Sequence, residues 1–470
     1  MHPHRRTYTT RIEATPEALL EWHASPGAFD RLAPPWSRIR PIESQGTIFP
    51  GDRRRFHVSA FGPLGFDWSL EHAALGDGSG FRDVQVAGPF HSWQHEHRFI
   101  PHENGTTLLE DRLEYTLPAG SVGDLLADGL VKGELDRLFA LRHQRTKLDL
   151  ARSARYWNPQ YRRIAVTGAS GLVGRRLVPF LRALGYDVVR LVRDAPAGSD
   201  AIRWNPDRGE IDREALEGVD AVIHLAGVSI AGGLWTRKRK AAIHDSRVNG
   251  TRFLATTLAS LRRPPRVLVS TSAVGFYGNA GDAVLTEASP QGTGFLAGVC
   301  AAWESAADAA RGAGIRVVHP RFGVVLAGEG GSLPVMMKPF QLGFGGAVGD
   351  GKQYFSWVAL DDLIGILLEA VEHEGLDGAV NATAPEPVSN RQFGKTLGHV
   401  LHRPSVVPAP APMMRLILGQ LADELLLASQ RVMPCRLQDA GFRFGYPTLE
   451  EALRHELGRF RPEDIPDSGS

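Results

Sequence analysis

Cysteine is scarce in this sequence, because Cys300 and Cys435 are the only two among 470 residues. This scarcity excludes a disulfide framework and a cluster of cysteine zinc ligands. No apolar run reaches the roughly 18 residues that a membrane-spanning helix needs. The polar start, Met1 to Arg6, also lacks the apolar stretch of a signal peptide. We therefore expect a cytoplasmic protein that does not bind a membrane.

An excess of charge of either sign is also missing, since 53 basic and 52 acidic residues leave a formal net charge of +1. Such a balance gives no reason to expect nucleic acid or an anionic lipid as a partner. The composition, 43% hydrophobic and 22% charged, is that of an ordinary globular protein, and the length suffices for two or three domains. We expect an enzyme or a small-molecule binding protein.

One segment near the middle has the layout of a strand, a phosphate-binding loop and a helix. The apolar run 163–167 leads into three glycines spaced by three, and leucines at helical spacing follow. The first glycine permits a tight turn, the second lets backbone N–H groups approach a pyrophosphate, and the third allows close helix packing. We predict that a dinucleotide binds at this helix N-terminus. The predicted contacts are Gly168, Ala169, Ser170, Gly171, Leu172, Val173 and Gly174.

The end of the next predicted strand bears on which dinucleotide binds. Arg193 stands nineteen residues after Gly174, about where an NAD site carries an acidic residue for the ribose 2′-hydroxyl. A guanidinium there, with Arg190 close by, suits a 2′-phosphate instead. We predict NADP as the cofactor, with NAD and a solvent-facing Arg193 as the alternative.

Two more strands are expected to end at the same edge of a parallel sheet. The buried run 220–224 is followed by Leu225, Ala226 and Gly227, and the run 266–270 ends in the hydroxyl residue Ser270. Doubly wound folds bind their ligands at this edge, so these four residues are candidate cofactor contacts.

A helical pattern after residue 234 carries three cationic or titratable groups on one face. Lys240, His244 and Arg247 follow one another at spacings of four and three residues. This face is either solvated or lines a pocket for an anionic substrate or a cofactor phosphate.

Residues 1–153 show a different pattern, in which β-rich segments are followed by a long helical stretch from about 121 to 152. This order is typical of an α+β domain whose sheet wraps one helix. Within it, His91, Trp93, His95 and His97 alternate with other residues and so share one strand face. A metal site requires three converging ligands, and we interpret these histidines as cavity-lining or solvated rather than metal-binding.

Three segments of this first region resemble the START-like superfamily, also described as Bet v 1-like or polyketide cyclase-like. They are Ala14-Thr15-Pro16-Glu17, Gly88 to Phe99 and Asp111 to Tyr115. The resemblance implies a helix-grip fold that encloses an apolar cavity, and hence a small hydrophobic ligand.

Residues 163 to about 457 resemble an extended short-chain dehydrogenase/reductase of the NAD-dependent epimerase/dehydratase kind. The matching segments include Thr167 to Gly174, His224 to Gly227, Ser270 to Ser272, Phe276 to Gly278, and Pro320-Arg321-Phe322-Gly323. The resemblance implies an α/β Rossmann-like doubly wound parallel sheet over 161–405, a small C-terminal domain of unknown function over 406–458, and a small-molecule substrate. Arg321 is counted with the candidate cofactor contacts.

The catalytic pair of this family is missing from its usual place. Ordinary members carry a tyrosine and, four residues later, a lysine that lowers the tyrosine pKa. With Glu304 as the helix anchor, these positions hold Leu296 and Cys300, and neither side chain does that chemistry. The candidate substitutes are Ser272 or Thr271 as hydroxyl partner, Tyr277 as proton donor or packing residue, Lys240 or Arg247 as positive charge, and Cys300 as nucleophile.

Three functions stay open at this point. The first is an NADP-binding oxidoreductase or epimerase with an apolar-ligand domain at its N-terminus. The second is a catalytically silent NADP-binding sensor or scaffold, and the third is a cyclase or lipid-type carrier regulated by the Rossmann domain. An apolar helix predicted over 413–427 is expected to contribute to the core or to a homodimer contact.

Overall fold

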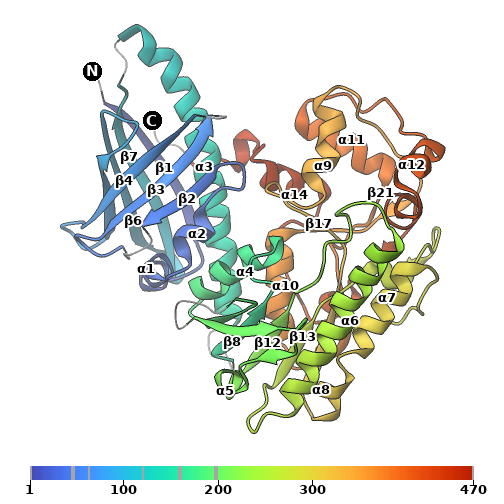
Figure 1. Ribbon diagram of the computed structural model, residues 1–470. Coiled ribbons are helices and arrows are strands. Elements are labelled where there is room, and N and C mark those ends of the chain that lie inside the picture. Colours follow the sequence, from blue (N-terminus) through green and yellow to red (C-terminus); the bar gives the residue numbers. More distant parts are fainter. Residues whose placement is uncertain are drawn as a thin grey trace. The chain divides into compact units, whose positions relative to one another are not determined.

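The computed structural model of the chain describes residues 3–43, 48–61, 64–118, 121–156, 161–194 and 200–467 (Figure 1). The chain divides into two compact units. The first comprises residues 1–157, 179–185 and 457–470, and the second comprises 158–178 and 186–456. Among the described residues, no helix combines the length and the hydrophobicity that a membrane crossing requires.

The first unit contains a seven-stranded antiparallel sheet with the strand order β1-β7-β6-β5-β4-β3-β2. Its strands are β1 (His4–Ile12), β2 (Arg38–Glu43), β3 (Arg53–Phe61), β4 (Leu64–Ala74), β5 (Gly80–Ala87), β6 (Ser92–His102) and β7 (Thr106–Thr116). Its helices are α1 (Pro16–Ala24), α2 (Ala28–Leu32) and α3 (Ser121–Arg155), with short 3-10 turns η1 (Glu103–Gly105) and η4 (Pro462–Asp464).

The long helix α3 packs on one face of this sheet, as Figure 1 shows. Phe139 of α3 stacks on Tyr8 of β1 with ring centroids 4.5 Å apart. On β6 the alternation of side chains buries Trp93, His95 and His97 on the same side of the sheet. The alternating histidine stripe therefore faces the interior of the unit, whereas His91 is exposed.

The second unit is built on a nine-stranded sheet in the order β11-β10-β9-β8-β12-β13-β16-β14, with β20 also paired to β16. Its strands are β8 (Arg163–Thr167), β9 (Asp187–Val192), β10 (Ala201–Asn205), β11 (Glu210–Ile211), β12 (Ala221–His224), β13 (Val267–Ser270), β14 (Ser272–Ala273), β16 (Arg316–Phe322) and β20 (Gly378–Ala382). Smaller strand pairs are formed by β15 (Val284–Leu285) with β22 (Arg431–Val432), β17 (Val324–Leu326) with β19 (Trp357–Ala359), and β18 (Tyr354–Phe355) with β21 (Val388–Ser389).

Helices connect and cover these strands. They are α4 (Leu172–Ala183), α5 (Arg213–Leu216), α6 (Arg237–Ala259), η2 (Val274–Tyr277), α7 (Phe295–Ser305), α8 (Asp308–Gly312), α9 (Leu333–Gln341), α10 (Leu360–Glu372), α11 (Asn390–Leu401), α12 (Ala411–Leu418), the π-helical η3 (Ala422–Leu426), α13 (Cys435–Asp439) and α14 (Leu449–Leu457). α6 and α8 pack on one face of the sheet through Leu254, Leu258 and Ala310. The neighbouring strands β9, β8, β12, β13 and β16 run parallel, so the predicted Rossmann-like sheet is confirmed.

The strand order places a topological switch point between β8 and β12. From β8 the chain continues outward to β9 on one side, and it later returns to β12 on the other side of β8. Such a switch point leaves a crevice at the carboxyl ends of the two strands, where doubly wound folds bind ligands. The glycine loop follows β8 and the segment 225–227 follows β12, so both lie at this edge.

The prediction of one continuous helix over 413–427 was wrong. α12 ends at Leu418 because Gly419 takes a positive φ of 59°, and a π-helical turn begins only at Ala422. Leu416 is 86% exposed, so the apolar residues of α12 do not all enter the core of their own unit.

Candidate functional site

The glycine loop between β8 and α4 leaves no room for a side chain at its third glycine. Gly168 has a φ of +66°, which permits the turn out of the strand. A Cβ on Gly174 would lie 2.3 Å from the carbonyl oxygen of Gly168 and 2.6 Å from Cα of Ala169. A Cβ on Gly171 would lie 3.1 Å from the same oxygen. The N–H of Gly171 donates to the same oxygen at 2.9 Å, so the loop has the close turn of a dinucleotide-binding glycine loop.

The hydroxyl of Thr167 joins this loop to the end of β12. Its Oγ1 accepts hydrogen bonds from the backbone N–H of Leu225 at 3.0 Å and of Ala226 at 3.2 Å. Since this oxygen lies 2.7 Å from Nδ1 of the buried His224, the hydroxyl donates its proton to that nitrogen. The two predicted cofactor segments, 168–174 and 225–227, are therefore held together at one sheet edge.

The other predicted cofactor contacts lie in contrasting surroundings. Arg193 directly follows β9 and is exposed, with its guanidinium 3.3 Å from the carboxylate of Asp207 in a surface ion pair. Ser270 ends β13 and is fully buried, and its hydroxyl has no hydrogen-bond partner among the described residues. Arg321 is buried in β16 and its guanidinium pairs with a carboxylate.

Three predicted site residues meet in one buried network. Ser272 donates to Glu304 at 2.7 Å, and Arg321 binds the same carboxylate through Nε and Nη2, both at 2.8 Å. Arg321 Nη1 also donates to the hydroxyl of Tyr277 at 2.9 Å, and this hydroxyl donates to Asn381 at 2.7 Å. Burial raises the pKa of Tyr277 above its ordinary value. The network links η2, α7, β16 and β20.

The two residues at the family's usual tyrosine and lysine positions lie on α7, where they are buried and unreactive. Leu296 and Cys300 pack against Gly275, whose added Cβ would lie 3.3 Å from Leu296 and 3.7 Å from the Cys300 sulfur. Burial raises the pKa of the Cys300 thiol to about 12, so the thiol stays protonated near neutral pH. A protonated, buried thiol is a poor nucleophile.

Lys240 and Arg247, the two candidates for the positive charge of the missing lysine, lie on α6. The Lys240 ammonium lies 5.3 Å from the ring centroid of Phe295, the first residue of α7, and it donates to the side chain of Gln420. Arg247 is buried, with its guanidinium 5.0 Å from the Trp303 ring and donating to the Val228 carbonyl at 2.9 Å. Burial lowers the Arg247 pKa from its usual value.

A pocket of about 210 Å³ opens at the start of α7. Leu296 and Gly275 form one wall, and Arg415, Asp423 and Glu424 contribute polar groups. Glu424 accepts hydrogen bonds from the backbone N–H of Phe295 and Leu296, which satisfies two free donors at the N-terminus of α7. The polar groups from 415–424 were not expected from the sequence, because they come from a segment over a hundred residues away.

The first unit contains a larger cavity of about 320 Å³ between the sheet and α3. Most of its lining is apolar, with Phe56, Trp68, Phe90 and Leu138 as representatives. Its polar lining residues are His23, His72, Asp83, His95, His97, Ser37, Arg54, Glu134 and Arg142.

In comparisons with known proteins, two segments of the second unit match described families. Residues 164–382 match the NAD dependent epimerase/dehydratase family, and residues 409–456 match a domain of unknown function, DUF1731. An epimerase family protein of Mycobacterium bovis is 42% identical over 296 residues, which cover 63% of this chain and 98% of that protein.

Two solved structures are similar to the chain. A nucleoside-diphosphate sugar epimerase of Corynebacterium glutamicum is 34% identical with a TM-score of 0.78, over 96% of this chain and 90% of that chain. A human epimerase family protein, solved with NADPH, is 31% identical with a TM-score of 0.57, over 63% of this chain and 99% of that chain.

Proposed function

We propose that the second unit binds NADP and acts with it on a small molecule, because this chain belongs to the NAD-dependent epimerase/dehydratase family. The observation that carries this proposal is the glycine loop, where added Cβ atoms at Gly171 and Gly174 would occupy the space against Gly168. The segment 225–227, tied to the loop through Thr167, completes the proposed cofactor edge. When bound, the nicotinamide supplies a hydride donor or acceptor.

The preference for NADP over NAD is proposed on the position of Arg193. The residue is exposed beyond β9, and its Asp207 partner lies in a surface ion pair that a 2′-phosphate can replace at little cost. A human relative was solved with NADPH, in agreement with this choice. Titration of the full chain with NADPH and NADH tests it: NADPH is expected to bind at least tenfold more tightly, and Arg193→Asp is expected to remove this preference. Equal affinities, or a preference that survives Arg193→Asp, would refute it.

We propose that the substrate binds in the 210 Å³ pocket next to Leu296. Arg415 and Asp423 form an ion pair of 2.8 Å at its wall and offer both a cation and an anion to a polar substrate. Lys240 supplies a positive charge beside the start of α7, the segment that carries Leu296. In this proposal Ser272 and Tyr277 hold the buried network, and Lys240 places its charge beside the pocket through Gln420, which donates to the lining residue Glu424 at 2.7 Å.

A catalytically silent NADP sensor is the second candidate, favoured by Leu296 and the protonated Cys300 thiol. Two readouts separate the two functions: NADPH absorbance with small carbonyl compounds, and product analysis with sugar nucleotides, because an epimerase regenerates its cofactor in each turnover. An active enzyme oxidises NADPH with a carbonyl compound or converts a sugar nucleotide into an isomer, and Lys240→Met then slows turnover. A sensor binds NADPH, gives neither NADPH oxidation nor product, and changes only in stability when the cofactor is bound.

For the first unit we propose a helix-grip domain that binds a small apolar ligand, with domain limits near 1–153, 161–405 and 406–458. Its support is the 320 Å³ cavity, whose walls are mostly apolar, between the antiparallel sheet and α3. The alignment with the Corynebacterium protein covers 96% of the chain, which indicates that this unit also occurs beside a related epimerase unit. Identification of the bound ligand would decide whether this unit acts as a carrier or as a cyclase.

A further inference from the structure

One wall of the first unit's cavity carries a row of imidazole and carboxylate side chains. The strand registers place His72 of β4 opposite Asp83 of β5, and Asp83 opposite His95 of β6. His97 follows two residues later on the same face of β6. All four side chains are buried and line the cavity. Three adjacent strands thus bring their polar groups to one place.

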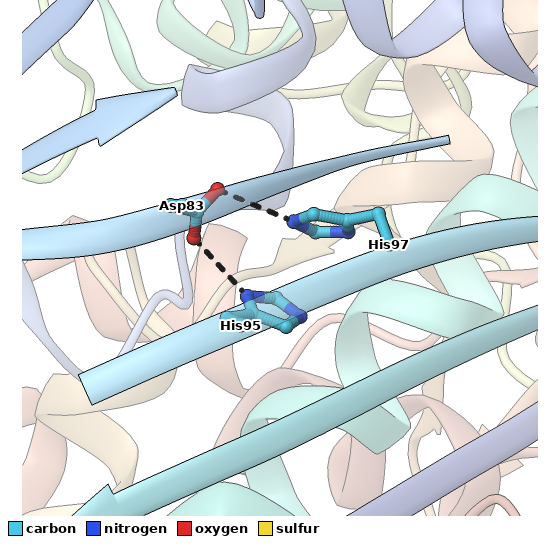
Figure 2. Close-up of side chains that lie close together, drawn as sticks. All are labelled: Asp83, His95 and His97. Carbon is cyan, nitrogen blue, oxygen red and sulfur yellow. Dashed lines mark ion pairs between the residues drawn. The ribbon is translucent and has the colours of Figure 1, made fainter. Parts of the chain in front are cut away.

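The ring nitrogens converge on the carboxylate of Asp83, as Figure 2 shows for His95 and His97. His95 Nδ1 lies 3.2 Å from Oδ2, and His97 Nε2 lies 3.7 Å from Oδ1. His72 Nε2 is also 3.7 Å from Oδ1. Contacts of 3.7 Å are too long for hydrogen bonds. Ligands at zinc bond lengths of about 2.0 to 2.1 Å in a tetrahedron lie roughly 3.3 Å apart, which is close to these separations.

A second carboxylate orients the two rings of β6. Oδ1 of Asp111 lies 2.7 Å from Nε2 of His95 and 2.7 Å from Nδ1 of His97. These are the ring nitrogens that face away from Asp83, so N–H donation to Asp111 leaves the Asp83-facing nitrogens free to bind a metal. His143 donates to the other Asp111 oxygen at 2.6 Å, and its Nδ1 contacts Thr10 at 2.8 Å. Ligating histidines in metalloproteins have this kind of carboxylate partner.

Charge balance also favours a cation between these groups. Asp83 and Asp111 are both deeply buried, and buried carboxylates require compensating positive charge. One divalent ion carries the two positive charges that balance them. Arg142, a further residue of the cavity wall, has a buried Nε without a hydrogen-bond partner among the described residues, so an anionic group of a ligand can be paired there.

We propose that Asp83, His95 and His97 bind a divalent transition-metal ion of the zinc class, with its fourth position facing the cavity beside His72. Imidazole nitrogen with one carboxylate oxygen is a ligand set that Zn²⁺ accepts, and three protein ligands leave a position for water or an organic oxygen donor. A ligand suited to this cavity has an apolar body and an anionic oxygen donor. The metal proposal stands apart from the apolar-ligand proposal, because zinc binding is measured without any organic ligand.

The test uses the full chain, freed of metal with a chelator and titrated with Zn²⁺ by calorimetry, with elemental analysis after removal of excess ion. One equivalent of zinc per chain is expected. Asp83→Asn and His95→Gln are each expected to weaken binding at least 100-fold, and Asp111→Asn about 10-fold to 100-fold. The matched control is His91→Gln, since His91 precedes the same strand but is exposed, and it is expected to bind like the wild type.

Cobalt(II) bound to the wild-type chain provides a readout that needs no variant. Visible absorption bands of a four- or five-coordinate ion with nitrogen and oxygen ligands are expected, and Zn²⁺ should abolish them by competition. Failure of the wild type to bind either ion at one equivalent would overturn the proposal. So would zinc affinity that survives both Asp83→Asn and His95→Gln, and the cluster would then be a hydrogen-bonded network that holds no metal.

Discussion

The guanidinium of Arg321 and the carboxylate of Glu304 form a two-point ion pair, with Nε to Oε1 and Nη2 to Oε2 both at 2.8 Å. Through its third nitrogen, Arg321 also donates to the Tyr277 hydroxyl, which in turn donates to Asn381. Tyr277 is 2% exposed, and the residues lining the nearby 210 Å³ pocket include Gly275 and Gly278 on either side of it in sequence. We therefore assign Tyr277 a positioning role in the proposed site.

Replacing Tyr277 with phenylalanine is expected to destabilise the second unit. The change leaves Asn381 Oδ1 and Arg321 Nη1 without the hydroxyl between them, and a buried polar group that loses its partner costs about 1 to 3 kcal/mol. Thermal unfolding measures this cost, with the half-buried Tyr354→Phe as the control. NADPH affinity should stay within twofold of the wild type. Unchanged stability together with lost turnover would instead assign Tyr277 the proton-donor role.

Cys300 is expected to resist thiol reagents in the folded chain. Its pKa of about 12 and its burial leave almost no accessible thiolate at pH 8. A disulfide reagent should label at most Cys435 under native conditions and both cysteines after denaturation, as mass spectrometry of the peptides can show. Rapid native labelling of Cys300 would contradict its assignment as a packing residue and revive the nucleophile hypothesis.

The stability of the second unit should fall as the pH drops below about 6.5 because of His224. Its pKa in the folded chain is lowered to about 4 by burial, so the folded state holds the imidazole neutral while the unfolded chain protonates first. The neutral form fits, since Nδ1 accepts from Thr167 and Nε2 donates to Thr251 at 3.0 Å. The contribution is complete above pH 6.5 and declines by about 1.4 kcal/mol per pH unit toward pH 4.

His224→Gln separates this effect from other titrating groups. The thermal transition of the second unit is the one whose midpoint temperature rises when NADPH is added. Between pH 7 and pH 5 this midpoint should drop more steeply in the wild type than in the variant. Parallel pH profiles would show that His224 is not the source of the acid sensitivity.

A larger side chain introduced on α3 should fill the cavity of the first unit. Leu138 lines the cavity, whereas Leu130 on the same helix is 68% exposed. Leu138→Trp is expected to weaken binding of an apolar fluorescent probe at least tenfold, and Leu130→Trp should leave it unchanged. Equal probe binding by both variants would place the probe outside the cavity.

Local sequence patterns were sufficient to predict the glycine loop. The spacing of Gly168, Gly171 and Gly174 after an apolar run specifies a turn, a close approach and a helix start, all within twelve residues. The prediction of a helix over 413–427 failed for a local reason as well. Gly419 interrupts an otherwise apolar run, and its positive φ ends the helix there.

The polar clusters depend on contacts between distant segments, which a single sequence does not specify. The alternation of His95 and His97 was visible, but the positions of Asp83 and Asp111 opposite them depend on the registers of two hairpins. Glu424 likewise reaches the start of α7 from 128 residues away. Predicting such sites requires knowledge of which strands pair and which segments pack together, not only of the order of elements.

The most direct test of the cofactor proposal is an NADPH titration of wild type, Gly174→Ala and Gly250→Ala. A Cβ at Gly174 would approach the Gly168 carbonyl to 2.3 Å, whereas one at Gly250 of α6 meets nothing within 4 Å. The wild type and Gly250→Ala are expected to bind NADPH with the same Kd within twofold, and Gly174→Ala at least tenfold more weakly. A wild-type chain that binds no NADPH, or a Gly174→Ala variant that binds it as tightly as the wild type, would contradict the proposed cofactor site.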